Sequence, residues 1–179
     1  YQTLNYGRLD GELRGLCQEK NAATILASVD ELRKSGYDIQ PDHIRNGFAH
    51  VCNLTGLRGR WQQVASHPTV ICDTGHNTGG IGYIVEQLRL FQTGNLHIII
   101  GMVNDKDIRS VLRILPQRAC YYFTKANIKR ALNENALQQS ASEAGLKGTV
   151  WPDVKSAFYA AKQAAAEEDL IFIGGSTFV

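Results

Sequence analysis

Three uninterrupted apolar runs in the second half of the chain restrict its fold more than any other feature of the sequence. They cover residues 96–101, 120–124 and 170–173, and segments with helical periodicity separate them. A strand that is apolar on both faces needs a covering layer on each face, which is the usual situation in a parallel sheet flanked by helices. We therefore expect residues 57–179 to form an α/β, Rossmann-like domain with a mostly parallel sheet and helices on both faces.

The remaining elements of this domain follow from shorter patterns. Residues 61–65 and 69–72 predict an antiparallel pair of strands across the sequence Ser66-His67-Pro68. Helices are expected between the strands, over residues 81–91 and 108–115, in "NENALQQSASEAG" and in the alanine-rich "DVKSAFYAAKQAAAEED".

The first third of the chain has a different, helical character. Asn21 precedes the periodic stretch "AATILASVDELRKSG", so it is expected as an N-cap, with Gly36 as the stop signal. A second helix is expected in "PDHIRNGFAHVCNL", with Pro41 near its start. The turn-rich "TGLRGRW" follows, and we place a domain boundary near Gly56.

Composition excludes several classes of partner. The net charge of +2 and the lack of a dense basic run give no reason to expect nucleic-acid binding. Neither a signal peptide nor an apolar segment of membrane length is present, so no membrane association is expected. The four cysteines are far apart, and Cys72 and Cys120 fall in apolar runs that we expect to be buried; a reducing, cytoplasmic location is favoured over disulfide pairing.

Polar residues follow three of the predicted strands. Residues 70–72 lead into "DTGHN" (73–77), the run 96–101 leads into "NDKD" (104–107), and the last run ends in "GGS" (174–176). Parallel strands end at one edge of a sheet, where open α/β folds bind their ligands. Each segment also has a plain structural interpretation, as a capped turn, a solvated loop and a tight turn. Their combination favours a binding site.

The residue types suggest what such a site could bind. Asp73 could accept hydrogen bonds from ribose hydroxyls or orient a cation, and His76 and Lys106 could bind a carboxylate or phosphate. The turn that contains Ser176 could offer backbone N–H groups to an anion. The sequence contains neither the glycine-rich dinucleotide fingerprint nor a phosphate-binding P-loop.

Five stretches of the sequence form an ordered series of motifs. In order, they are "NAAT" (21–24), "LRGRWQ" (57–62), "DTGHN" (73–77), "GMVNDKD" (101–107) and "GGS" (174–176). This series resembles the folylpolyglutamate synthases and the bifunctional dihydrofolate synthases of the Mur ligase superfamily. The resemblance covers nearly the whole chain. It implies that residues 1–56 are the C-terminal tail of a central ATPase domain and that residues 57–179 are the Rossmann-like Mur ligase C-terminal domain.

The resemblance also implies an activity. In this family ATP phosphorylates a carboxylate of the folate or dihydropteroate substrate, and the amine of L-glutamate attacks the acyl phosphate to form an amide. Asn21, Arg60 and Asp73 are then expected to bind ATP, and His76 and Ser176 to position glutamate. We add Lys106 to the glutamate-binding group, and we assign no catalytic residue and no metal ligand in this chain.

The chain lacks an initiator Met and stops after "GGSTFV", so we expect it to be an excerpt of a larger protein. The P-loop and the Mg²⁺ ligands are expected upstream, the excerpt alone is expected to be inactive, and the enzyme is expected to be a monomer. Two alternatives stay open. One is a peptidoglycan-type Mur ligase that adds an amino acid to a nucleotide-linked peptide, and the other is a non-catalytic nucleotide-binding domain.

Overall fold

The structure is a computed structural model that describes residues 1–3, 5–91, 94–104 and 107–179. The chain divides into two compact units, Tyr1–Arg60 and Trp61–Val179, which are described separately below.

The first unit is a small helical body with one short hairpin. Leu9, Leu26 and Ile44 form its buried core, and Phe48 packs against them. The elements are β1 (Gln2–Thr3) and β2 (Gly7–Arg8), which pair antiparallel, followed by α1 (Gln18–Lys34), α2 (Pro41–Ala49) and α3 (Val51–Thr55).

Helix α1 begins before the position that the sequence predicts. Its N-cap is Cys17, and the backbone N–H of Gln18 bonds to the carbonyl of Gly15 at 2.9 Å, so the first turn forms earlier in the chain. Asn21 therefore lies inside the helix, and its prediction as an N-cap is wrong. Gly36, with φ +93°, follows the helix where a stop was expected.

The expected single helix of residues 41–54 is in fact two. His50 leaves the helical region with φ −133° and separates α2 from α3. A carboxylate from another segment supports the break, because Glu12 Oε2 accepts the backbone N–H of Cys52 at 2.7 Å. The Glu12 backbone N–H in turn donates to the carbonyl of Phe48 at 3.0 Å. A side chain thus satisfies a backbone group that a continuous helix would bond internally.

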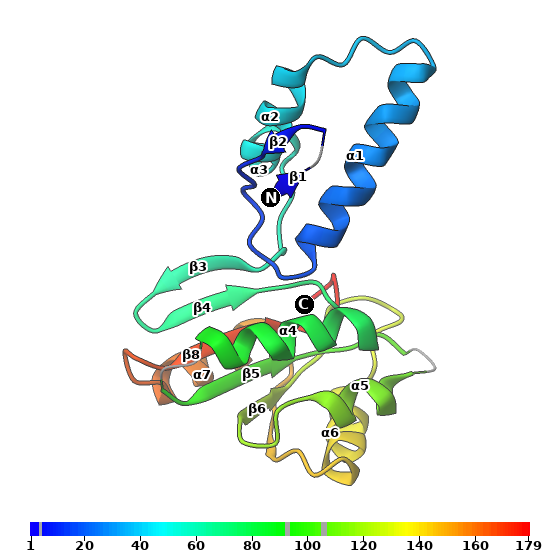
Figure 1. Cartoon of the computed structure of the whole chain (residues 1–179). Helices are drawn as coiled ribbons and strands as arrows, with labels where there is room; N and C mark the ends of the chain where they lie inside the picture. The colour runs from blue at the N-terminus through cyan, green and yellow to red at the C-terminus, as the bar shows by residue number, and fades with distance from the viewer. Residues whose placement is uncertain (4, 92–93, 105–106) are drawn as a thin grey trace. The chain divides into compact units, whose positions relative to one another are not determined.

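The second unit contains a six-stranded sheet with the order β3-β4-β8-β5-β6-β7 (Figure 1). Strand β3 pairs antiparallel with β4 across the expected turn, and all the other neighbouring strands are parallel. The strands are β3 (Gln62–Ser66), β4 (Thr69–Cys72), β5 (Leu96–Ile100), β6 (Cys120–Phe123), β7 (Gly148–Val150) and β8 (Leu170–Gly174).

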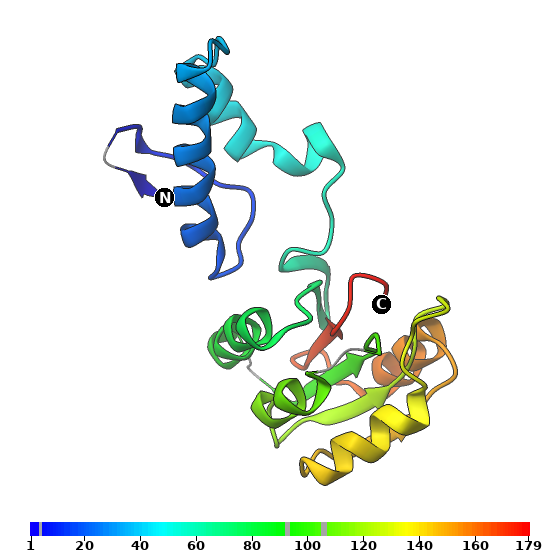
Figure 2. The same ribbon diagram turned by 90° about the vertical axis from the view of Figure 1, so that its right-hand side faces the viewer.

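Helices cover both faces of this sheet, as the sequence predicts. The helices α4 (Thr78–Phe91), α5 (Ile108–Ile114) and α6 (Glu134–Glu143) pack on one face, and α7 (Val154–Ala164) packs on the other (Figures 1 and 2). The alternation within β5 shows this directly, because Ile98 and Ile100 face the first set of helices whereas Ile99 faces α7. The α/β, mostly parallel fold is confirmed.

Two local features differ from the expectation. Helix α4 begins at Thr78, three residues before the predicted start at Ile81. The edge strand β7 was not predicted, because it has only three residues and its first two are exposed. Gly148 permits this strand because a Cβ there would collide with the backbone of Tyr121 on β6.

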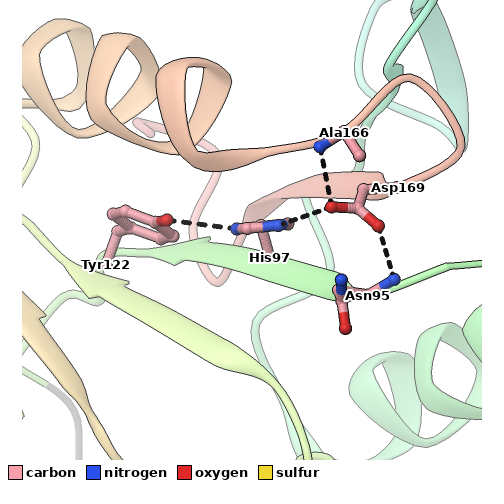
Figure 3. Close-up of polar contacts among 5 residues, drawn as sticks. All are labelled: Asn95, His97, Tyr122, Ala166 and Asp169. Carbon is pink, nitrogen blue, oxygen red and sulfur yellow. Dashed lines mark hydrogen bonds and ion pairs between the residues drawn. The ribbon is translucent and has the colours of Figure 1, made fainter.

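The side chains of Tyr122, His97 and Asp169 form a buried polar chain beneath α7 (Figure 3). His97 Nδ1 lies 3.1 Å from the Tyr122 hydroxyl, and its Nε2 lies 3.2 Å from Asp169 Oδ2. The carboxylate also accepts the backbone N–H groups of Ala166 at 2.9 Å and Asn95 at 2.6 Å. The network joins β5 and β6 to the segment that leads into β8.

Burial by itself would raise the pKa of the Asp169 carboxyl. The hydrogen bonds from Ala166, Asn95 and His97 outweigh it, so this pKa lies below its ordinary value. The carboxylate is therefore ionised and fixed in place at neutral pH. His97 and Tyr122 serve packing and hydrogen bonding here.

The burial of two cysteines is only partly as expected. Cys72 is half-buried, and this burial raises the pKa of its thiol. Cys120 is exposed, so its predicted burial is wrong; it is the first residue of β6, and the three residues that follow it are buried.

Candidate functional site

The carboxyl ends of β4, β8, β5 and β6 meet at one edge of the sheet because these strands are parallel neighbours. Backbone hydrogen bonds continue beyond the strands. The N–H of Asp73 bonds to the carbonyl of Ile173 at 3.1 Å, and the N–H of Gly101 bonds to Gly174 at 3.3 Å. The segments that begin with Asp73, Gly101 and Gly175 are thus held side by side at the edge where open α/β folds bind ligands.

The Asp73 carboxylate is hydrogen-bonded to Trp61, the first residue of the second unit. Its Oδ2 accepts the backbone N–H of Trp61 at 2.7 Å, and its Oδ1 accepts that of Gly75 at 2.8 Å. Trp61 has a φ of +49°, which is uncommon for a residue with a side chain, and its indole is buried against Phe91 and Phe172. The carboxylate is therefore fixed in orientation at the sheet edge.

Asn77 caps helix α4, so the plain structural interpretation holds for this residue. Its Oδ1 accepts the N–H of Gly80 at 2.8 Å, and its carbonyl accepts the N–H of Ile81 at 2.9 Å. His76 is exposed, and its Nδ1 lies 3.1 Å from the carbonyl oxygen of Thr74. Because a carbonyl only accepts, this contact assigns the proton to Nδ1 and leaves Nε2 as an acceptor in the neutral ring.

The glycines at the end of β8 allow a close approach to the neighbouring strands. A Cβ at Gly174 would lie 2.6 Å from the carbonyl oxygen of Asp73, and one at Gly175 would lie 2.7 Å from Ile100 Cγ1. Gly175 also has a φ of +92°, a region that disfavours side chains. Ser176 is buried, and its Oγ accepts the N–H of Phe178 at 3.2 Å. The turn is therefore restricted in conformation, and Ser176 lies at the same sheet edge as the segment that begins with Asp73.

The other predicted ligands are placed differently. Asn21 and Arg60 are exposed and belong to the first unit; Asn21 Nδ2 donates to Gln18 Oε1 at 3.0 Å and Arg60 Nη1 to the carbonyl of Gly59 at 3.4 Å. Lys106 lies outside the described residues. Asp73 and His76 follow β4, and Ser176 follows its parallel neighbour β8, so these three residues belong to the same sheet edge. The roles of all six residues stay predictions.

Sequence reasoning missed the loop after β6. Its Arg130 guanidinium lies 5.1 Å above the ring centre of Phe178, and its backbone carbonyl accepts the N–H of Asn104 at 2.9 Å. Within the same loop, Lys125 lies 2.8 Å from Glu134, and this contact lowers the pKa of the Glu134 carboxyl. The signal was available, because "KANIKR" follows a buried strand in the same way as the three segments that were recognised.

Over the ranges that the structure describes, no three His, Cys, Asp or Glu side chains gather closely enough to hold a metal ion. Over the same ranges, no helix has both the length and the apolar character needed to cross a membrane.

Residues 59–177 match the protein family described as "Mur ligase, glutamate ligase domain". The chain belongs to the Mur ligase family. This match covers the whole sheet and the edge that carries Asp73, His76 and Ser176. The assignment agrees with the Rossmann-like domain that was expected from the sequence.

Individual Mur ligase relatives are similar over nearly the whole chain. The dihydrofolate synthase/folylpolyglutamate synthase of Escherichia coli is 31% identical over 174 residues, which is 96% of this chain and 38% of the relative. The structure of the Mycobacterium tuberculosis folylpolyglutamate synthase complexed with ADP has a TM-score of 0.81 at 25% identity, covering 96% of this chain and 40% of that one.

A bifunctional folylpolyglutamate synthase/dihydrofolate synthase with Mn, AMPPNP and L-glutamate bound has a TM-score of 0.74 at 27% identity. Its match covers 97% of this chain and 39% of that one. The resemblance to these synthases is confirmed, and the chain spans about two fifths of the length of the relatives that it matches.

Proposed function

We propose that this chain is the C-terminal part of an ATP-dependent ligase that adds L-glutamate to folates through an acyl-phosphate intermediate. Folylpolyglutamate synthase activity is the core of the proposal, and dihydrofolate synthase activity is the second activity to be tested. The observation that carries it is the 31% identity with the bifunctional E. coli synthase over 96% of the chain. The enzyme's substrates would be ATP, L-glutamate and a folate or dihydropteroate.

The proposal gives the candidate residues two tasks. Asn21, Arg60 and Asp73 would bind the nucleotide, with Arg60 offsetting phosphate charge. His76, Ser176 and Lys106 would position glutamate for attack. These are tasks of orientation and charge neutralisation, which rigid backbone and fixed side chains perform well.

The held geometry of two of these residues supports the assignment. Both carboxylate oxygens of Asp73 are anchored by backbone N–H groups, and Ser176 sits in a turn that a Cβ would obstruct. Mg²⁺ is implied with ATP, as relatives were crystallised with Mn and AMPPNP. Because the described residues gather no carboxylate cluster, we assign the metal ligands to the remainder of the protein.

A peptidoglycan-type Mur ligase is less well supported. The relatives named above are folate ligases, and the loop "NDKD" fits that class better than the amino-acid loop of the peptidoglycan enzymes. A non-catalytic nucleotide-binding domain is also disfavoured, because the similarity extends through the glutamate ligase domain. We further propose a cytoplasmic monomer that binds neither nucleic acid nor membranes.

The test is ADP release by the complete protein that carries this chain. Release should require both L-glutamate and a folate acceptor, with dihydropteroate and tetrahydrofolate assayed separately to distinguish the two activities. Omission of either substrate serves as the control. Release that depends on a nucleotide-linked peptide, and not on a folate, would establish the peptidoglycan alternative.

A further inference from the structure

The backbone of Trp61 has a conformation that side chains rarely adopt. Within the described ranges it is the one residue other than glycine with a positive φ, which is +49°. This left-handed region is unfavourable for a residue with a Cβ, and it persists only where the surrounding structure holds the backbone in place. Two contacts of Trp61, one through its side chain and one through its backbone, provide that hold.

The first contact is the packing of the indole. Trp61 is 6% exposed and belongs to the core cluster that includes the buried side of α4. Its ring centre lies 5.6 Å from that of Phe91 on α4 and 6.5 Å from that of Phe172 on β8. A large change in the Trp61 backbone would withdraw the ring from this packing, so the core restricts the conformation of the chain at this residue.

The second contact is the hydrogen bond to the Asp73 carboxylate. Oδ2 of Asp73 accepts the N–H of Trp61 at 2.7 Å, which fixes the peptide that joins Arg60 to Trp61. Oδ1 accepts the N–H of Gly75 at 2.8 Å, and a Cβ at Gly75 would lie 2.5 Å from Ile84 Cδ1. The carboxylate is therefore held by the turn that follows β4, and it holds the Arg60–Trp61 peptide in turn.

The register of β3 and β4 places this peptide at the edge of the candidate site. The two strands are antiparallel, and Gln62 at the start of β3 pairs with Cys72 at the end of β4 (Figure 1). The chain therefore enters β3 at the edge where the parallel strands end. Arg60 is exposed, and its Nη1 donates to the carbonyl of Gly59 at 3.4 Å. The direction of its side chain thus depends on the backbone that carries it.

We propose that Trp61 is a positioning residue that directs the Arg60 cation toward the phosphates of ATP, and that Asp73 acts on the nucleotide in part through Trp61. The inference rests on the proposed function, in which Arg60 and Asp73 bind ATP. The φ of Trp61 sets the direction in which the chain leaves toward Arg60, and the two contacts fix this angle. Each carboxylate oxygen of Asp73 has a second lone pair, so its bond to Trp61 is compatible with a contact to the nucleotide.

A fixed backbone makes the Arg60 cation more effective. An arginine loses conformational freedom when it binds a phosphate, and a main chain that already directs it to the site reduces this cost. Without the indole, the backbone at position 61 would return to the favoured negative φ. Arg60 would then be misdirected although its own side chain is unchanged. The unfavourable φ therefore serves the orientation of the residue that precedes it.

A double-mutant cycle in the complete enzyme tests this role. Trp61→Leu should raise the KM for ATP about 10-fold and leave the KM for L-glutamate unchanged. Arg60→Gln should raise the KM for ATP about 10- to 100-fold, as expected for a lost charge-assisted contact. The double variant should be no worse than Arg60→Gln, because a residue that acts through the Arg60 charge has no effect once that charge is absent.

Phe123→Leu is the matched control. Phe123 is fully buried in the same core cluster but lies on β6, so this variant loses comparable packing away from Arg60. It should lower stability in urea, leave the KM for ATP unchanged and have the same effect with and without Arg60→Gln. Trp61→Phe is the conservative variant, because it keeps an aromatic ring against Phe91 and Phe172, and it should retain a KM for ATP close to that of the wild type.

Asp73→Asn provides a second test that does not disturb the core. The amide keeps the shape of the carboxylate, but its single oxygen can accept only one of the two N–H groups that Asp73 accepts. The loss in kcat/KM for ATP should be several-fold smaller in the Arg60→Gln background than in the wild-type background. This comparison also decides the question if Trp61→Leu does not fold, which circular dichroism would show.

Three outcomes would overturn the inference. They are a wild-type KM for ATP in folded Trp61→Leu, losses that multiply fully when Trp61→Leu or Asp73→Asn is combined with Arg60→Gln, and an equal rise in the KM values for ATP and L-glutamate. A failure of the proposed function itself would look different, because the wild type would then show no glutamate-dependent ADP release.

Discussion

Replacing Asp169 with Asn should markedly destabilise the second unit. The carboxylate accepts three bonds, from Asn95 at 2.6 Å, Ala166 at 2.9 Å and His97 at 3.2 Å, in a site where its side chain is 3% exposed. The Asn side-chain amide keeps the shape of the carboxylate, but its NH₂ group replaces one acceptor oxygen. This donor would then face one of the N–H groups that the carboxylate accepts. With hydrogen bonds to a charged group contributing about 1.5–3 kcal/mol each, we expect a loss of about 2–4 kcal/mol.

Urea unfolding followed by tryptophan fluorescence measures this loss. Trp61 and Trp151 are the only two tryptophans and both belong to the second unit, so the signal reports on that unit. Glu167→Gln is the control, since it neutralises an exposed carboxylate two residues away and should change stability by at most about 0.5 kcal/mol.

The pH dependence has a defined sign. Because the folded-state pKa of Asp169 is lowered, the unfolded chain binds the proton first as the pH falls, and stability is lost below the ordinary carboxyl pKa of about 4. The difference in the free energy of unfolding between the wild type and Asp169→Asn should therefore be largest at neutral pH and should decrease as the pH falls below about 4. A difference that stays constant down to pH 3 would refute the role assigned to this charge. The same conclusion would follow if Asp169→Asn were as stable as Glu167→Gln.

Three further predictions concern the sheet edge and the activity of the chain as a whole. In the complete enzyme, Asp73→Ala should mainly lower kcat/KM for ATP, and His76→Ala should mainly lower kcat/KM for glutamate. Each loss should correspond to about 1–3 kcal/mol. Wild-type kinetics in both variants, with the fold intact, would show that the two residues serve only the structure of the turn. Gly175→Ala should lower stability in urea by about 1–3 kcal/mol because of its φ of +92° and the contact with Ile100; an unchanged midpoint would contradict this. The 179-residue chain alone should fold but release no ADP with folate and glutamate, because it lacks a phosphate cradle; measurable turnover would place the catalytic groups in this chain.

The sequence by itself determined the sheet and the edge that carries the candidate site. The runs in β5, β6 and β8 are apolar except for His97, and such strands are stable only when both faces are covered. The polar residues that follow β4 and β8 then had to meet at one edge, because parallel strands end together. Asp73 and Ser176 could therefore be placed near each other from the pattern alone.

Local rules failed where a distant segment supplied the partner. The break between α2 and α3 depends on Glu12, which is 40 positions from Cys52 in the sequence. Asn21 has the residue type of a cap, but the turn from Gly15 to Gln18 starts the helix earlier. In the first case the backbone N–H of Cys52 finds its acceptor in a distant segment, and in the second the N–H of Gln18 finds it in the preceding turn. The residue types at these positions do not predict either partner.

Only the tertiary structure decided how the side chains at the edge are used. It showed that the Asp73 carboxylate holds Trp61, 12 positions away, and that Arg130 stacks on Phe178, which lies on a different loop. Such contacts join segments that are remote in sequence, and periodicity along one segment carries no information about what it touches. The pattern of apolar residues determines which edge gathers the polar groups, and packing determines which of those groups remain available to a ligand.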